Sequence, residues 1–237
     1  MKELFFETID STNTYLKKHV DELEDMTFLS SDYQSVGRGR NQRNWSSSKG
    51  LNLMFSLLIK DEKVLDQYSC LSILCAYSII KVLEEYGVDD VMIKWPNDVF
   101  VRDGKICGIL LEGISHERLE AVICGIGLNV NQTDFDKDMI HEPVSMKRVL
   151  NEDIDIVSLR KRVYQVLSEN IEKLKCGYDF CDEICCYDYL KGKDVYALIS
   201  GERKQVKVMG IDHDYSLRVN DQGRIVNLNS SEVTFHI

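Results

Sequence analysis

Several features that mark other protein classes are missing from this 237-residue sequence. It has only 2 prolines, and no segment has the composition of a disordered tail or flexible linker. Its 8 cysteines include no Cys-x-x-Cys pair, and no His-x-x-x-His completes a zinc site, so we interpret them as reduced. No apolar run approaches the roughly 18 residues that span a bilayer, and acidic residues come too early for a secretory signal. We therefore expect a cytoplasmic protein with no membrane partner.

An excess of positive charge is also absent. The net charge is −10 with a pI near 5.0, and lysines and arginines form no block. A protein that holds nucleic acid by its phosphates carries a basic patch, so we expect no nucleic-acid partner. The 5 histidines are scattered, and neither Gly-x-Ser-x-Gly nor His-Glu-x-x-His occurs. The sequence therefore gives no support to a triad hydrolase or a zinc protease.

The sequence does contain enough apolar material for a folded core, because 44% of its residues are hydrophobic. Periodicity and turn residues predict strands at 3–8, 27–34, 51–59, 91–95, 99–102, 106–114 and 119–130, and helices at 15–23, 65–86, 157–174 and 179–190. Pro143 is expected at the first position of a further helix. Short strands then follow in little chain, so we place a boundary near Lys191, with a main domain over 1–190 and a small barrel over 191–237.

Residues 37–45 form a polar loop in which glycines alternate with arginines. Arg38, Arg40 and Arg43 stand within six residues, and Gly37 and Gly39 let the backbone approach a ligand closely. The loop is not a dinucleotide fingerprint, because Gln42 takes the third glycine position, and no Gly-Lys-Ser/Thr of a P-loop occurs. A solvated basic surface loop is the alternative, but the combination favours phosphate binding.

Two lysine-containing segments interrupt the predicted strands. The run Lys94-Trp95-Pro96-Asn97-Asp98 must bulge or turn, because proline cannot donate to a strand ladder, and either an active-site bulge or an ordinary tight turn explains it. Lys105 begins a buried strand, where it could neutralise a carboxylate or phosphate oxygen or simply extend to solvent. Neither segment decides its role alone.

The segment Gly125-Ile126-Gly127-Leu128-Asn129-Val130-Asn131 ends a strand with two glycines and two asparagines. Its glycines permit close backbone approach, and its amides can read the edge of a heterocycle such as a purine or a ureido ring. A strand with a glycine kink is the competing interpretation.

Taken in order, these segments closely resemble the motif series of biotin-protein ligases. The motifs are Asp10-Ser11-Thr12-Asn13, Gln34, Gly37-Arg38-Gly39-Arg40 with Trp45, Lys94-Trp95-Pro96-Asn97-Asp98, Gly104-Lys105 with Gly108-Ile109-Leu110, and Gly125-Ile126-Gly127-Leu128-Asn129. Each motif is modest by itself, whereas the ordered set is highly specific. The resemblance covers residues 5–131 by motif and the rest by organisation, since that family ends in a small SH3-like β-barrel.

The resemblance implies an α/β catalytic domain with a mixed sheet, a fold shared with lipoate ligases. It also implies a two-step reaction in which biotin and Mg·ATP give biotinyl-5′-AMP and pyrophosphate, and a lysine of a biotin carboxyl carrier protein or domain then displaces AMP. Both steps develop charge on oxygen atoms, so positioned Arg, Lys and Mg²⁺ matter more than a general base. The resemblance allows a homodimer, on which the sequence itself is silent.

The same resemblance assigns roles to individual residues. Biotin would contact Ser11, Thr12, Asn13 and Gln34, with Arg38, Gly39 and Arg40 in the loop that closes over biotin and the adenylate. Lys105 would hold the carboxylate and α-phosphate oxygens, and together with Arg38 and Arg40 it would be catalytic. Trp45, Asn97 and Asn129 would lie on the nucleotide side, and Asp98 would be a metal ligand.

Some features depart from the family pattern. Gln42 stands where many members have glycine, and Ser48 replaces a frequent proline, so the loop dynamics could differ. The chain begins at the catalytic domain, without the winged-helix domain of the members that act as repressors, so we expect no operator binding. A lipoate or octanoate ligase is the nearest alternative, but it would need a long apolar pocket. A non-catalytic adenylate-binding regulator is the other, against which Lys105 and Arg40 both argue.

Overall fold

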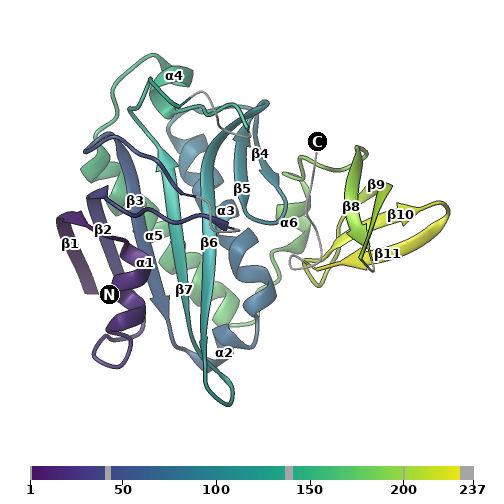
Figure 1. The fold of residues 1–237 in the computed structure, drawn as a ribbon, viewed down its shortest axis with the longest axis horizontal. Helices are drawn as coiled ribbons and strands as arrows, with labels where there is room; N and C mark the ends of the chain where they lie inside the picture. The colour runs from purple at the N-terminus through teal and green to yellow at the C-terminus, as the bar shows by residue number, and fades with distance from the viewer. Residues whose placement is uncertain (1, 41–43, 137–140, 200, 230–237) are drawn as a thin grey trace.

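A seven-stranded mixed sheet forms the larger part of the computed structural model, which describes residues 2–40, 44–136, 141–199 and 201–229 (Figure 1). The strand order is β1-β2-β3-β7-β6-β5-β4, and only β1 and β2 run parallel. The strands are β1 (Lys2–Ile9), β2 (Thr27–Gln34), β3 (Asn52–Ile59), β4 (Val91–Lys94), β5 (Asp98–Val101), β6 (Gly104–Ser115) and β7 (Leu119–Asn129). The mixed-sheet α/β fold predicted from the sequence is confirmed.

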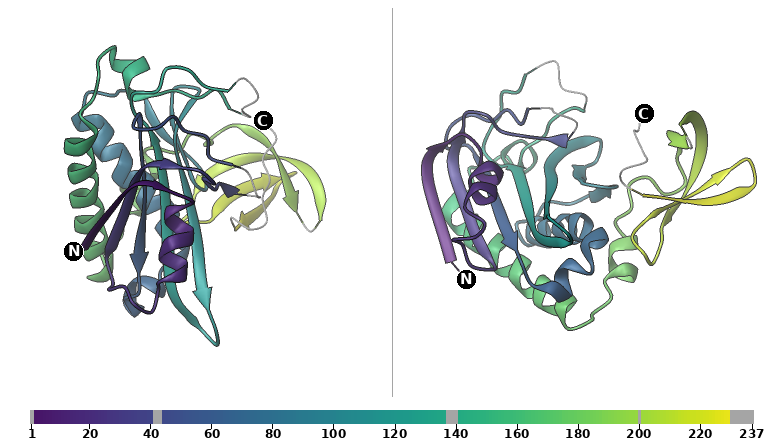
Figure 2. Two further views of the ribbon diagram at one scale, coloured as in Figure 1. Left: turned by 60° about the vertical axis from the view of Figure 1, so that its left-hand side comes forward. Right: turned by 60° about the horizontal axis from the view of Figure 1, so that its bottom comes forward.

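Helices cover both faces of this sheet. The long helices α3 (Tyr68–Glu85) and α5 (Ile156–Lys175) pack on one face, whereas α1 (Thr12–Lys18) packs on the other (Figure 2). Neighbouring residues of β3 show the division, since Leu57 belongs to the large core and Leu58 to a smaller core with Leu16 of α1. Successive side chains of a strand point to opposite faces, so a strand covered on both sides must be apolar throughout. All eight residues of β3 are accordingly buried.

Helix α1 begins at a capping residue that also places functional groups. Ser11 is the N-cap, and its hydroxyl accepts a hydrogen bond from the Thr14 backbone N–H at 3.4 Å. Such a cap satisfies one of the free N–H groups at a helix start. Thr12 and Asn13 lie in the first turn and are buried against the sheet. The predicted cap chemistry of this segment is therefore present, although the helix ends at Lys18 rather than Leu23.

The C-terminal part is a separate four-stranded antiparallel sheet (Figure 1). Its order is β11-β10-β9-β8, with β8 (Asp194–Ile199), β9 (Glu202–Ile211), β10 (Leu217–Asp221) and β11 (Arg224–Leu228). The Trp95 indole N–H donates to the Tyr215 carbonyl at 3.0 Å and links this sheet to the larger one. The all-β C-terminal unit agrees with the sequence analysis, while the boundary near Lys191 stays a prediction, and residues 230–237 of the expected barrel lie outside the described residues.

Three predicted helices differ in the structure. The helix expected at 65–86 is divided into α2 (Glu62–Leu65) and α3, because Gln67 leaves helical geometry and its amide donates to the Leu174 carbonyl. Only α6 (Cys181–Cys185) forms within 179–190, since Tyr187 and Tyr189 form backbone hydrogen bonds with Ile93 instead. Pro143 does not begin a helix: it bridges Lys105, and α4 (Met146–Leu150) starts after Ser145, whose hydroxyl caps it.

The cysteines form no disulfide among the described residues. All eight cysteines are free thiols, and the Sγ atoms of Cys181 and Cys185 lie 3.7 Å apart. Within the described ranges, no three His, Cys, Asp or Glu side chains are grouped so that they could hold a metal ion. Nor does any helix in that part of the chain have the length and apolar character to cross a membrane.

Candidate active site

A single cavity of about 430 Å³ brings the predicted site residues together. The twelve that line it are Ser11, Thr12, Asn13, Gln34, Arg38, Gly39, Arg40, Trp45, Asn97, Asp98, Lys105 and Asn129. They come from α1, the loop after β2, the β4–β5 connection and strands β6 and β7, which lie far apart in sequence. Arg43 and Gln42, which entered the interpretation of the loop, lie outside the described residues. The co-location is observed, and the individual roles stay predictions.

One end of the cavity is neutral and polar. The Gln34 side-chain carbonyl accepts from the Thr12 backbone N–H at 2.7 Å and from the Thr12 hydroxyl at 3.1 Å. The Ser56 hydroxyl lies 2.6 Å from Thr12 Oγ1 and 2.5 Å from Asn13 Oδ1. Asn13 then donates through Nδ2 to Glu112 at 2.8 Å. Buried polar groups that are paired in this way hold fixed positions, so this end can recognise a rigid polar head group.

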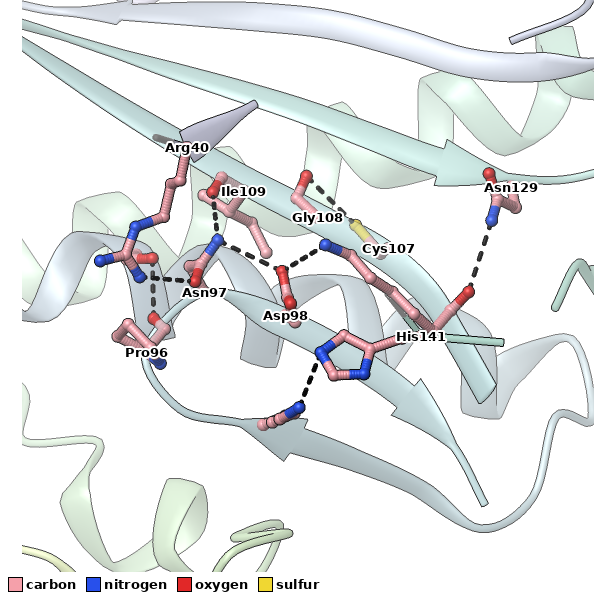
Figure 3. Close-up of polar contacts among 12 residues, drawn as sticks. Arg40, Pro96, Asn97, Asp98, Cys107, Gly108, Ile109, Asn129 and His141 are labelled. Atoms are coloured by element: carbon pink, nitrogen blue, oxygen red, sulfur yellow. Dashed lines mark hydrogen bonds and ion pairs between the residues drawn. The ribbon is translucent and has the colours of Figure 1, made fainter. Parts of the chain in front are cut away.

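The opposite end is charged. Lys105 Nζ lies 2.7 Å from Asp98 Oδ1, and Arg40 donates from Nη1 to Asn97 Oδ1 at 2.8 Å (Figure 3). Asn97 is held in turn, because its Nδ2 donates to the Ile109 carbonyl at 2.9 Å. Figure 3 shows Arg40, Asn97 and Asp98 turned towards one another beside β6. Two cationic side chains on a supported amide–carboxylate pair form a suitable site for anionic oxygens.

The connection that carries Asn97 and Asp98 is a tight turn between paired strands. Lys94 and Asp98 are register partners, so only Trp95, Pro96 and Asn97 lie between β4 and β5. Trp95 is buried, and the Ser72 hydroxyl of α3 donates to the Pro96 carbonyl at 2.9 Å. The burial of Trp95 and the hydrogen bond from Ser72 thus hold the turn in place. The ordinary tight turn is therefore observed, and it places Asn97 and Asp98 in the cavity, while their part in an active site stays a prediction.

Glycines form the floor under Trp45. A Cβ atom on Gly127 would lie 2.5 Å from Cε2 of the indole, and one on Gly108 would lie 3.0 Å from Cζ3. Lys105 Nζ lies 5.7 Å from the centre of the same ring. Among the described residues Trp45 Nε1 finds no hydrogen-bond partner. Close backbone approach is therefore the reason for glycine at these strand positions.

Gly127→Ala tests this arrangement. The added methyl group overpacks the indole, so we expect a loss of roughly 1–3 kcal/mol in the free energy of unfolding. The half-buried Trp45 ring should also move off this floor and become more exposed, which shifts its emission to the red. Gly113→Ala is the matched control, because the nearest atom to its Cβ is Cδ1 of the flexible Leu119 side chain at 3.1 Å. Equal effects of the two substitutions in urea unfolding would contradict the packing argument.

The side-chain amide nitrogen of Asn129 contacts backbone carbonyl groups of the chain itself. Its Nδ2 donates to the Val144 carbonyl at 3.0 Å and lies 3.4 Å from the Lys105 carbonyl. The amide therefore ties Val144, next to Pro143, to the end of β7. The Asn129 nitrogen thus has partners within the chain, and the expectation that the amides of this segment read a heterocycle edge stays a prediction.

Several lining or supporting residues were not assigned a role from the sequence. Ser56 and Glu112 support the polar end, and Lys94 and His141 lie beside the charged end with Nζ and Nε2 2.8 Å apart. The alternation of side chains along a strand could have indicated Ser56 and Glu112 from the sequence. Ser56 is the one hydroxyl in an otherwise apolar stretch, and Glu112 shares the strand face of Gly108, whose Cβ position faces Trp45.

Lys94 is the most buried of the lysines at the site, with 5% of its surface exposed. Burial is the main cause that lowers the pKa of Lys94 to about 8, and Lys105 and Lys193 act in the same direction, against Asp98. Below pH 8 the ammonium is charged in both the folded and unfolded chain, so folding bears the full cost of burying it. As pH rises from 8 towards 10.5, the unfolded chain holds the proton more often than the folded one. The cost of burying the charge therefore falls, and the free energy of unfolding increases.

Lys94→Met should therefore stabilise the fold most at neutral pH. The gain is at most about 3 kcal/mol, from the conversion of a pKa difference into free energy. It should shrink as the pH rises through 10.5, above which the lysine loses its proton in the unfolded chain as well. Urea unfolding of both proteins across this range measures the difference. A gain that does not change with pH would show that burial of the charge is not its cause.

The fold and the cavity define an α/β protein with a two-ended pocket, one end neutral and polar and the other lined by cationic side chains. The sequence profile of the biotin/lipoate A/B protein ligase family matches residues 5–129, more than half of the chain, and the chain belongs to that family. The resemblance to biotin-protein ligases indicated by the motifs is confirmed.

Individual relatives support the same family. The bifunctional ligase/repressor BirA of Escherichia coli is 35% identical over 136 residues, which are 56% of this chain and 42% of that protein. The biotin–[acetyl-CoA-carboxylase] ligase of Mycobacterium tuberculosis is 30% identical over 118 residues, 48% of this chain and 43% of the relative. The chain thus matches about two fifths of these curated relatives. The biotin protein ligase of Aquifex aeolicus in complex with biotin and ATP superposes with a TM-score of 0.89 at 26% identity, covering 99% of this chain and 98% of the other.

Proposed function

We propose that this protein is an ATP-dependent biotin-protein ligase. It would activate biotin as biotinyl-5′-AMP and transfer it to a lysine on the biotin carboxyl carrier domain of acetyl-CoA carboxylase or a related carboxylase. The observation that carries the proposal is the two-ended cavity, in which a neutral hydrogen-bonding end and a cationic end share one space of about 430 Å³. The solved Aquifex aeolicus relative, which holds biotin and ATP together, supports the same assignment.

The polar end favours biotin over a simple acyl chain. A ureido ring offers one carbonyl oxygen and two N–H groups, which match the hydroxyl and amide groups of Ser11, Thr12, Asn13 and Gln34. Lipoate and octanoate have no such polar group at that end, so they could not use the hydrogen-bonding capacity that these hydroxyl and amide groups have left beyond their contacts with one another. Covering a polar group without using that capacity costs free energy, which favours biotin.

The charged end serves the first chemical step. The biotin carboxylate attacks the α-phosphorus of ATP, an acyl–phosphate bond forms, and the bond to pyrophosphate breaks. Negative charge grows on the phosphoryl oxygens, where Lys105 and Arg40 supply positive charge and hydrogen-bond donors. Arg38 pairs with Glu112 beside the polar end and would act there as part of the loop over the ligand. In the second step the carrier amine attacks the acyl carbon and AMP leaves with the bonding electrons. Both steps use the same cationic groups, because the leaving group is anionic each time.

Mg²⁺ would enter with ATP and neutralise phosphate charge. The residues present fit such a use, since Mg²⁺ is commonly held by one or two carboxylates together with substrate phosphates. Asp98 provides that carboxylate, and its neighbour Asn97 donates to it from Nδ2 at 3.2 Å. The Lys105 ammonium on Asp98 holds the carboxylate in place beside the cavity.

An ATP–pyrophosphate exchange assay with purified protein tests the proposal. Exchange that depends on biotin is expected. Exchange that depends on lipoate or octanoate instead would assign the sister activity of the family. Biotin binding without any exchange would indicate a non-catalytic adenylate-binding regulator, and both of these results would overturn the proposal.

A further inference from the structure

Glu112 connects the polar end of the cavity to the arginine loop. Its side chain is 14% exposed and lies on β6. Oε2 accepts from Asn13 Nδ2 at 2.8 Å, and Oε1 lies 3.1 Å from Arg38 Nη1. One carboxylate thus joins the start of α1 and the loop after β2 to the central strands.

The contact with Asn13 determines which way the Asn13 amide faces. An ionised carboxylate can only accept hydrogen bonds, so the Asn13 group that meets Glu112 must be the NH₂ donor. The Asn13 carbonyl oxygen is therefore directed to the Ser56 hydroxyl, 2.5 Å away. An amide beside a neutral partner could adopt either orientation at similar cost. Glu112 consequently fixes the donor and acceptor positions at this end of the cavity.

Very little space separates these groups from the sheet. A Cβ atom on Gly125 would lie 2.9 Å from Asn13 Cγ, so the Asn13 side chain rests directly on β7. Rotation of the amide is restricted by this packing, and Asn13 is itself buried. The hydrogen-bond polarity set by Glu112 is therefore imposed on whatever ligand group occupies this end.

The contact with Arg38 adds a link to the loop. The Arg38 side chain is 46% exposed, and an ion pair of that exposure contributes only about 0–1 kcal/mol to stability. The ion pair matters for position rather than for stability. It ties Arg38, near the start of the loop, to the same carboxylate that holds Asn13 at the polar end of the cavity. The loop and the polar end are coupled through one side chain.

We propose that Glu112 is a positioning residue for the proposed biotin ligation. It orients the Asn13 amide for the ureido head group and anchors Arg38 in the loop over it. This inference rests on the proposed function and assigns a part to a residue outside the twelve that the motifs indicated. Glu112 does not touch the reacting atoms, so its loss should affect biotin binding more than the chemical step.

Glu112→Gln tests the proposal, because glutamine has the same shape but can also donate. We expect the KM for biotin to rise about tenfold or more, as when one charge-assisted hydrogen bond is lost, with kcat and the KM for ATP within about threefold of wild type. A residue with only a structural part would not separate the two KM values. Glu120→Gln, an exposed carboxylate on the neighbouring strand β7 that pairs with His116, is the matched control.

Two further variants make the result specific. In an Asn13→Ala background, Glu112→Gln should add less than about twofold, because the shared interaction is already lost. Arg38→Gln changes an exposed side chain, and it should raise the KM for biotin in the parent but much less once Glu112 is Gln. If Glu112→Gln proves unstable in thermal unfolding, Glu112→Asp takes its place. The effect of Arg38→Gln on the KM for biotin is then compared between the parent and the Glu112→Asp variant.

The outcomes separate the two proposals. Wild-type protein without biotin-dependent exchange would reject the biotin ligase and with it this inference. An active wild type whose Glu112→Gln variant keeps the biotin KM of Glu120→Gln would reject the part assigned to Glu112 alone. Additive effects of Asn13 and Glu112 would also overturn it.

Discussion

Lys105→Ala should lower biotin-dependent ATP–pyrophosphate exchange by roughly 100-fold or more, as expected when a charge that stabilises a transition state is removed. The ammonium lies in the cavity on Asp98, 2.7 Å from Oδ1, and 3.1 Å from where a Cβ atom on Gly108 would be. Its backbone is fixed independently, since the Lys105 N–H donates to the Glu142 carbonyl at 2.8 Å. The substitution therefore removes a charge without moving the strand.

The fold of the Lys105 variant should be retained, which far-ultraviolet circular dichroism and thermal unfolding can check. Lys147→Ala is the control, because Lys147 pairs with Asp153 at the surface and does not line the cavity. Its exchange rate should stay near wild type. Exchange in Lys105→Ala that falls by less than about threefold would exclude Lys105 from the charge-stabilising role.

Arg40→Ala should release the adenylate from the site before transfer. The guanidinium donates to Asn97 at 2.8 Å and so joins the loop after β2 to the β4–β5 turn across the cavity. Without it, one charge-assisted contact that holds the loop against the turn is lost, and escape of the intermediate should increase about tenfold or more. Rapid filtration of protein loaded with biotin and ATP measures biotinyl-AMP in the filtrate over time.

Arg102→Ala provides the comparison for Arg40. Arg102 is exposed, pairs with Asp90 and lies at the far end of β5 from the cavity. Its adenylate should be retained as in wild type. If Arg40→Ala retains the intermediate equally well, the loop contact with Asn97 does not close the site.

Most strands of the large sheet were predictable because their residues are buried on one or both faces, whereas β1 has no buried residue. Residues 52–59 are an almost continuous apolar run, which is typical of a buried strand. The turn residues Asp103 and Gly104 separate two further strand-like runs. Strand order was not accessible in the same way. Asn52 pairs with Asn129 across the sheet, a contact between segments more than 70 residues apart, and local periodicity does not contain such long-range pairing.

Helix ends were the weaker part of the prediction. The segment 179–190 has helical spacing, yet Tyr187 and Tyr189 form backbone hydrogen bonds with Ile93 and leave the helix short. Tertiary hydrogen bonds override a local preference of a few tenths of a kcal/mol per residue, on the order of helix propensity differences. Helix α6 therefore ends at Cys185 because the residues after it form hydrogen bonds with Ile93 of β4.

The site was predictable as a set of residues but not as a set of contacts. Twelve residues chosen from ordered motifs line one cavity. Which of them support others depends on register, as when β6 and β7 place Glu112 opposite Ile123 and beside the buried Asn13. The carbonyl partners of Asn129 likewise follow from the path of the chain around Pro143. Such partners are set by the fold rather than by the motif.

The central claim is tested most directly by the mass of an acceptor. Purified protein is incubated with Mg·ATP, biotin and an isolated biotin carboxyl carrier domain, and the intact carrier is weighed by mass spectrometry. We predict the gain of one biotinyl group, which disappears when ATP is omitted or when the carrier lysine is replaced by arginine. An unmodified carrier, in a reaction where the protein still binds biotin, would contradict the proposed ligase.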